Sequence, residues 1–115
     1  MSEDGFASVG AVGELEELIA RSQASPTVLF LHDRWCPISA RAYKEMSRLA
    51  EEDAAKTALV DVTSGQALSH AIEERTGVRH ESPQVIVLRH GKATWHASHF
   101  AITARAVADA LTKNA

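Results

Sequence analysis

The chain has 115 residues, of which 45% are hydrophobic, with a formal net charge of −3 and one cysteine. This length supports one hydrophobic core, so residues 1–115 are expected to form a single domain. The mild negative charge without a basic stripe excludes the usual electrostatics of nucleic-acid binding, and one cysteine excludes an internal disulfide. With no apolar leader and no long apolar span, the sequence predicts a cytoplasmic protein that does not enter a membrane.

The first elements follow from hydrophobic periodicity. Residues 1–10 are predicted to be frayed or to carry a short edge strand around Phe6–Val9. Apolar residues at helical spacing then predict a helix over 12–19, and Ser25-Pro26 lies beyond its end. Thr27–Leu31 is a β-branched and apolar run of the kind that forms a buried strand.

A second helix is predicted to begin directly after the cysteine and to end in the charged stretch Glu51–Asp53. Cys36 is then the N-cap residue, and Pro37 occupies the first helical position, where its missing N–H does no harm. A sulfur at the N-cap faces unpaired backbone N–H groups and the positive end of the helix dipole, which favour thiolate over thiol. A small buried apolar residue is the alternative interpretation of a lone cysteine. The apolar face of this helix would consist of Ile38, Ala42, Met46 and Leu49.

A strand is predicted over Thr57–Val62. Thr63 and Gln66 have the spacing of a capping box, which predicts that they open the next helix. Gly77 is a suitable C-terminal stop for that helix.

The end of the chain has a different pattern. Residues 84–89 and 92–96 flank His90-Gly91 and predict a β-hairpin, after which Thr103 can cap a last helix. The resulting order, (β)αβαβαββα, predicts an α/β fold with a central mixed sheet of four or five strands flanked by about four helices.

This order, with a cysteine after the first long strand and a proline before the hairpin, resembles the thioredoxin-like fold. Trp35-Cys36 with its proline-containing turn is similar to the thioredoxin Trp-Cys-Gly-Pro-Cys segment, and Thr76–Pro83 resembles the thioredoxin approach to a cis-proline. Within that superfamily the sequence resembles most the monothiol bacilliredoxin (bacilliredoxin C) family. The matching stretches are Cys36–Ser39, His80–Val85, and Trp95–His99 with Ile102-Thr103.

The resemblance implies thiol-disulfide exchange with bacillithiol, a low-molecular-weight thiol used in place of glutathione. Cys36 would be the nucleophile that takes bacillithiol from a mixed disulfide with a client protein, and a second bacillithiol would regenerate it. With Ser39 at the position of a resolving cysteine, the mechanism is monothiol. Bacillithiolated clients and bacillithiol are the expected partners of a monomer that has no bound cofactor, with bacillithiol as co-substrate.

Three neighbours are predicted to support Cys36. Trp35 would shield the sulfur or contact the client, and Pro37 would start the helix. For Ser39 two interpretations stay open, a hydroxyl donor to the Cys36 thiolate or a serine that bonds to the backbone.

Four residues are predicted to bind substrate. The resemblance implies a cis peptide bond before Pro83, with the Ser82 backbone as a short edge for an extended substrate; a trans proline that begins a strand is the alternative. Because bacillithiol carries a malate with two carboxylates, Arg34 or Arg79 would be suitable cations for it.

A polar network of His80, Glu81, Trp95 and His96 is predicted to support the loop before Pro83. A metal site formed by His80, His96 and His99 is the alternative, but these residues do not complete a recognised zinc pattern. No metal is therefore predicted.

Two other functions are alternatives to thiol exchange. A non-catalytic carrier or sensor could hold an iron–sulfur cluster through Cys36 and an external thiol, in the manner of monothiol glutaredoxins that have a Cys-Gly-Phe-Ser motif. Pro37 argues against it, since it is bulkier than glycine and has no N–H to offer. A glutaredoxin-like arsenate reductase would need several arginines around its oxyanion, and Arg41 is one residue too early for a phosphatase-type loop.

Overall fold

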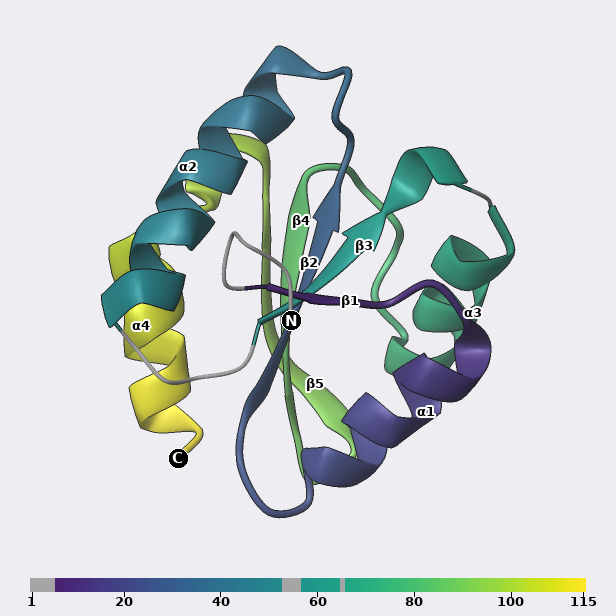
Figure 1. Ribbon diagram of the computed structural model, residues 1–115. Helices are drawn as coiled ribbons and strands as arrows, with labels where there is room; N and C mark the ends of the chain where they lie inside the picture. Colours follow the sequence, from purple (N-terminus) through teal and green to yellow (C-terminus); the bar gives the residue numbers. More distant parts are fainter. Residues whose placement is uncertain (1–5, 53–56, 65) are drawn as a thin grey trace.

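The computed structural model describes residues 6–52, 57–64 and 66–115. Figure 1 shows α2 and α4 covering one face of a central sheet, and α1 and α3 covering the other. The elements, in chain order, are β1 (Ala7–Ser8), α1 (Val12–Arg21), β2 (Thr27–His32), α2 (Pro37–Glu52), β3 (Thr57–Asp61), the 3-10 turn η1 (Val62–Ser64), α3 (Gln66–Thr76), β4 (Gln84–Arg89), β5 (Lys92–Ser98), the 3-10 turn η2 (His99–Ala101) and α4 (Ala104–Lys113).

The sheet has five strands in the order β1-β3-β2-β4-β5. β1, β3 and β2 are parallel, whereas β4 is antiparallel to both β2 and β5. The predicted mixed sheet and α/β, thioredoxin-like architecture are therefore confirmed. The short N-terminal edge strand is confirmed as well, as Ala7–Ser8 beside β3.

The central strand β2 divides the hydrophobic core into two layers. Its side chains alternate between the faces of the sheet, so Val28 and Phe30 pack beneath α2 and α4, and Leu29 and Leu31 pack beneath α1 and α3. All residues from Thr27 to Leu31 are buried. The end of β2 is thus held from both sides, and this is the strand end from which the cysteine segment emerges.

Local signals in the sequence place most element ends correctly. Gly77 has φ +72° and its N–H donates to the Glu73 carbonyl at 2.9 Å, which ends α3 as predicted. The hairpin turn has positive φ at both His90 and Gly91, as a type I′ turn requires. The Thr103 hydroxyl accepts a hydrogen bond from the Ala106 N–H at 3.1 Å and caps α4.

The predicted capping box at Thr63 is wrong. The Thr63 hydroxyl donates to Asp61 Oδ1 at 2.5 Å, and the Thr63 N–H donates to the same oxygen at 2.9 Å. This local Asx-type turn competes successfully for Thr63, ends β3 at Asp61 and places Val62 in η1. The helix end that was predicted at Asp53 lies outside the described residues; α2 is described to Glu52.

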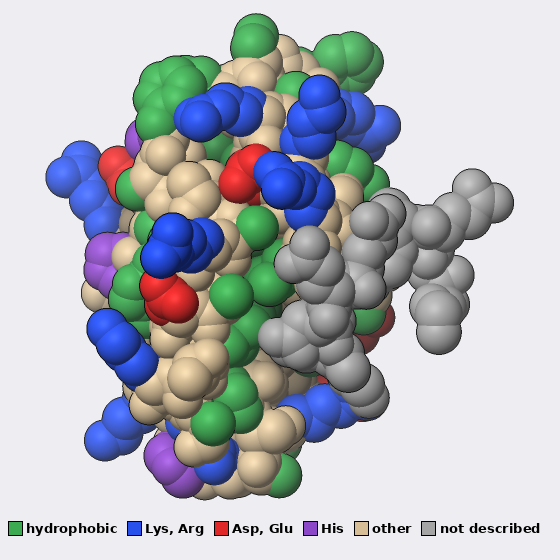
Figure 2. All heavy atoms as spheres, turned by 90° about the vertical axis from the view of Figure 1, so that its left-hand side faces the viewer, with side chains coloured by type: hydrophobic (Ala, Val, Ile, Leu, Met, Phe, Trp, Pro, Cys, Tyr) green, Lys and Arg blue, Asp and Glu red, His purple; other side chains and the backbone are tan. Residues whose placement is uncertain are grey.

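The face formed by α2 and α4 is shown in Figure 2. Its Lys and Arg side chains are dispersed, with hydrophobic, polar and acidic groups between them. Across the ranges that the structure describes, no helix is both long and apolar enough to cross a membrane.

Candidate active site around Cys36

Cys36 lies between the carboxyl end of β2 and the first turn of α2. The connection between these two elements is at the top of Figure 1. Its carbonyl accepts the first helical hydrogen bond from the Ala40 N–H at 3.0 Å, so Cys36 is the N-cap residue, as predicted. Exposed Pro37 begins the helix, and half-buried Cys36 remains accessible to solvent. Negative charge on the sulfur would face the N–H groups and positive dipole end of α2.

Asp33 shapes the turn that presents the cysteine. Its carbonyl accepts the Cys36 N–H at 3.1 Å, and its Oδ1 accepts the Trp35 N–H at 2.9 Å. These two bonds leave the Trp35 side chain projecting outward, where it is 78% exposed. Asp33 is absent from the predicted site, although an aspartate three residues before a helix start is a recognisable turn signal.

Ser39 is fully buried and has two partners. Its Oγ accepts the Asp33 N–H at 2.9 Å and lies 2.8 Å from Nδ1 of His32. The predicted alternative in which Ser39 bonds to backbone is therefore present. The hydroxyl has only one proton, and when a neutral His32 ring accepts it at Nδ1, that proton is not available to Cys36.

His32 is the partner of Ser39 that sequence reasoning missed. Its ring centroid lies 5.4 Å from that of Phe30 and 5.0 Å from that of Tyr43. Burial lowers the pKa of His32, while the negative charges of Asp61 and Asp33 act in the opposite direction. His32 is the last residue of β2. No local sequence pattern indicates that a residue at a strand end bonds to Ser39, seven positions later.

We expect this histidine to make stability pH-dependent. The folded protein holds His32 at a lowered pKa, so below about pH 6.5 the unfolded chain binds more protons at this residue and stability falls. Above that pH the ring is neutral in both states and its contribution is constant. Urea unfolding at pH 7.5 and 5.5 measures the loss, and a His32→Asn variant, which retains the other five histidines, should lose less. Equal losses in the two proteins would contradict this assignment.

Removing the Ser39 hydroxyl should destabilise the fold. In Ser39→Ala the Asp33 N–H and the His32 ring nitrogen lose their partner inside the structure, at a cost of about 1–3 kcal/mol in the free energy of unfolding. Ser47→Ala, on a less buried part of the same helix, is the control and should change stability by no more than about 0.5 kcal/mol. Urea denaturation gives both values; similar values for the two variants would show that the Ser39 bonds are energetically unimportant.

The loop before β4 lies next to the end of β2. Leu31 pairs with Gln84, so Pro83 lies beside the segment that leads to Cys36. The Ser82–Pro83 peptide bond is cis, as the family resemblance implied, and the buried Pro83 accepts the His99 N–H at its carbonyl, 3.1 Å away. Ser82 and Pro83 thus lie next to the strand end from which the cysteine segment emerges.

Gln84 fastens this loop. It is buried, its Nε2 donates to the Arg79 carbonyl at 2.9 Å, and its Oε1 accepts the Glu81 N–H at 3.3 Å. Both polar ends of the side chain are therefore used within the loop. The sequence pattern included Gln84 only as a strand residue, because its two bonds depend on how the loop folds back.

The predicted polar network is only partly assembled. The pKa of Glu81 is lowered, first by the Ser98 hydroxyl and then by the positive charges of His99, Arg79 and His96. His80 is held separately, through its backbone N–H, by Glu73 Oε2 at 2.7 Å. Trp95 is not part of this group, since it packs against the core beneath α2 and α4.

The two predicted anion-binding arginines have different surroundings. The Arg34 guanidinium donates to Asp61 Oδ2 at 2.5 Å and lies 5.9 Å from the centre of the Trp35 ring. Hydrogen bonds from Thr63, followed by the Arg34 contact, lower the pKa of Asp61. Arg79 is exposed beside Glu81. The structure therefore places Arg34 near the cysteine segment with a carboxylate partner already in place.

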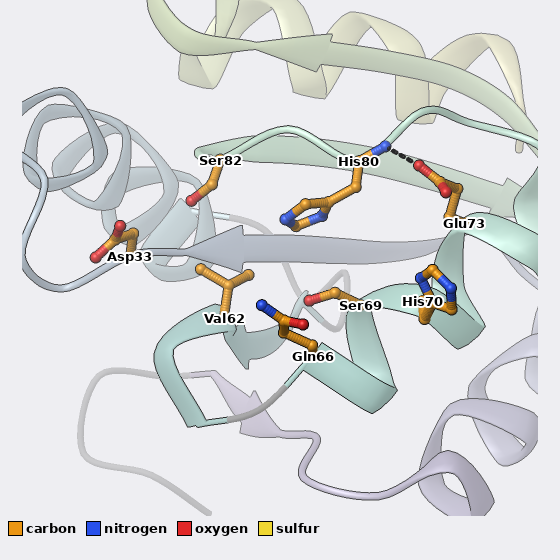
Figure 3. A pocket seen from close by; sticks show the side chains of 8 residues that line it. All are labelled: Asp33, Val62, Gln66, Ser69, His70, Glu73, His80 and Ser82. Carbon is orange, nitrogen blue, oxygen red and sulfur yellow. Dashed lines mark hydrogen bonds between the residues drawn. The ribbon is translucent and has the colours of Figure 1, made fainter.

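A hollow of about 330 Å³ opens beside the cysteine segment (Figure 3). It lies between the loop before Pro83 on one side and η1 and α3 on the other, with the end of β2 as its third wall. Within the described parts of the chain, no group of three or more His, Cys, Asp and Glu side chains is placed to hold a metal ion. The residues that line the hollow are Asp33, Val62, Gln66, Ser69, His70, Glu73, His80 and Ser82.

Comparisons with known proteins agree with the thioredoxin-like fold. The family model described as "Monothiol bacilliredoxin BrxC" matches residues 8–107. A solved structure described as a candidate oxidoreductase with a thioredoxin fold is similar with a TM-score of 0.84 and 27% identity, over 90% of this chain and 91% of that one. A point mutant of the thioredoxin from Halobacterium salinarum has a TM-score of 0.76 and 22% identity, over 99% and 94% of the two chains. The Fasciola hepatica thioredoxin has a TM-score of 0.75 and 19% identity, over 96% and 100%.

Proposed function

The chain belongs to the monothiol bacilliredoxin family, and from this we propose that it is a thiol-disulfide oxidoreductase that removes bacillithiol from protein mixed disulfides, with Cys36 as the nucleophile. The family and the oxidoreductase neighbour support a thiol redox function. The observation that carries the proposal is the single accessible cysteine at the N-cap of α2, beside the loop of Ser82 and Pro83.

The proposed reaction has two exchange steps. The Cys36 thiolate attacks the bacillithiol sulfur of the client's mixed disulfide, the client sulfur leaves as a thiolate and takes up a proton, and a Cys36–bacillithiol disulfide forms. The thiolate of a second bacillithiol then attacks that disulfide, which releases oxidised bacillithiol and restores Cys36. An external thiol is required for the second step because residue 39 is serine.

The surroundings of Cys36 suit both steps. The N-terminal dipole of α2 favours the negative charge of the attacking and leaving sulfur, and Trp35 offers an exposed aromatic surface to a client. We propose that the exposed Arg34 and Arg79 side chains bind the malate carboxylates.

Turnover tests the proposal. A bacillithiolated client enzyme is mixed with substoichiometric protein and either bacillithiol or glutathione as the reducing thiol, and release of client thiol is followed over time. We expect many client molecules to be cleared per protein with bacillithiol, and fewer with glutathione. Absence of turnover with bacillithiol would reject the proposal. Brown, dimeric purified protein would instead indicate the iron–sulfur carrier alternative.

A further inference from the structure

We propose that the hollow beside the cysteine segment binds the aminosugar part of the low-molecular-weight thiol, and that its carboxylates stay outside. This inference rests on the proposed function. Bacillithiol joins a cysteine with a free amine to a glucosamine, which in turn carries the malate. The ligand therefore has three chemically different parts, namely the cysteine with its amine, the glucosamine and the malate, and any of them could in principle occupy the hollow.

The hollow begins within one turn of the reactive sulfur. Asp33, which forms one wall, accepts the Cys36 N–H at its carbonyl, so the two residues are the ends of a tight turn. Ser82, on the loop side of the hollow and at the same end as Asp33, directly precedes Pro83. A group attached to Cys36 through a disulfide would therefore enter the hollow at the end where these two residues lie.

The walls offer hydrogen-bonding groups of the kind that sugars need. Figure 3 shows His80 pointing into the hollow from the loop, with Gln66 and Ser69 facing it from α3. Amide, hydroxyl and imidazole groups can each donate to or accept from sugar hydroxyls. The volume of about 330 Å³ lies at the lower end of the range for ligand pockets, which suits one sugar ring better than the whole thiol.

The charged residues that line the hollow favour binding of an amine over binding of a carboxylate. The carboxylates of Asp33 and Glu73 each accept one backbone N–H at one oxygen, and the second oxygen of each has no hydrogen bond from a described residue. Among the described lining residues there is no Lys or Arg. An ammonium or hydroxyl group would find acceptors here, whereas malate would meet two like charges.

Ser82 supplies an independent sign that the hollow is incomplete without a ligand. Its Oγ is buried and has no hydrogen-bond partner among the described residues. Buried polar side-chain atoms in folded proteins are usually paired, and an orphaned one at the wall of a polar hollow indicates a missing partner. In Figure 3 this hydroxyl lies on the side of the hollow nearest Asp33.

The test compares transfer to Cys36 from three forms of one peptide, disulfide-linked to bacillithiol, to cysteinyl-glucosamine without malate, or to cysteine alone. We expect both sugar-containing forms to react about tenfold faster than the third. Loss of malate should cost less than about threefold, because its carboxylates would meet only the exposed side chains of Arg34 and Arg79. Glu73→Gln keeps an acceptor for the His80 N–H but removes the charge, and Gln66→Leu removes the amide. Both variants should lower the ratio of the bacillithiol to the cysteine rate several-fold.

Glu74→Gln is the matched control, because Glu74 is the exposed neighbour of Glu73 on α3 and lies outside the hollow. It should leave the ratio unchanged, and each variant's cysteine rate corrects for folding and thiol reactivity. The inference would be overturned if Glu73→Gln and Gln66→Leu had the same ratio of bacillithiol to cysteine rate as the wild type. It would also be overturned if removal of malate alone abolished the preference over cysteine. Absence of transfer from every peptide would instead reject the proposed function.

Discussion

The Cys36→Ser variant is expected to leave a bacillithiolated client unchanged under conditions in which the wild-type protein clears it. Cys36 is the only thiol in the chain, and a serine hydroxyl is not ionised near neutral pH and cannot form a disulfide. Because serine is a favoured N-cap residue, the substitution should preserve the start of α2. The rate of client release, followed by chromatography of the client, measures the effect.

Two controls make this result interpretable. Circular dichroism and urea unfolding should show that Cys36→Ser remains folded with nearly wild-type stability. Bacillithiol alone should clear the client at the same slow rate with and without the variant. Clearance by Cys36→Ser at the wild-type rate would show that Cys36 is not the nucleophile.

The second large effect is expected from Ser39→Cys, which should change the mechanism from monothiol to dithiol. In the variant, the introduced thiolate at position 39 attacks the Cys36 sulfur of the mixed disulfide, bacillithiol leaves as a thiolate, and an internal disulfide between positions 36 and 39 forms. Residues 36 and 39 are the N-cap and third residue of α2, a spacing at which side chains meet and Cα atoms fall within disulfide range. The external thiol is then no longer needed to release bacillithiol from Cys36.

Intact mass distinguishes the two mechanisms after one equivalent of bacillithiolated client. Wild type should carry one bacillithiol adduct, whereas Ser39→Cys should lack the adduct and be two hydrogens lighter than its reduced form. Ser39→Ala, which removes the same hydroxyl without adding a thiol, should keep the adduct. A persistent adduct on Ser39→Cys would mean that residue 39 cannot reach the Cys36 sulfur.

Much of the fold could be predicted because its signals are local. The β-branched run at Thr27–Leu31 is buried as expected, and the apolar stripe that includes Ala42 and Met46 faces the core. The prediction for Thr63 is wrong because two local patterns compete for one hydroxyl, and the turn with Asp61 prevails over the helix cap. Spacing alone does not rank these two alternatives.

The site could be predicted less completely, because its parts come from different segments. Cys36, Pro37 and the cis bond before Pro83 belong to sequence motifs and lie as expected. The bonds of Ser39 to His32 and of Gln84 to its loop form only once the chain has folded.

Trp95 lies apart from the polar network for a reason of strand geometry. Trp95 and His96 are neighbours on one strand, so their side chains point to opposite faces of the sheet. A strand at this position therefore keeps Trp95 and His96 from sharing one polar network. Trp95 packs in the core instead, and the charges of His96 and His99 act on Glu81.

The most direct test of the central claim is intact-mass spectrometry of wild-type protein mixed with an equimolar bacillithiolated client, without free thiol. The proposed function predicts that the client loses the mass of one bacillithiol and that the protein gains the same mass, with the adduct mapped by peptide analysis to Cys36. An unmodified Cys36 together with an unchanged client would contradict it.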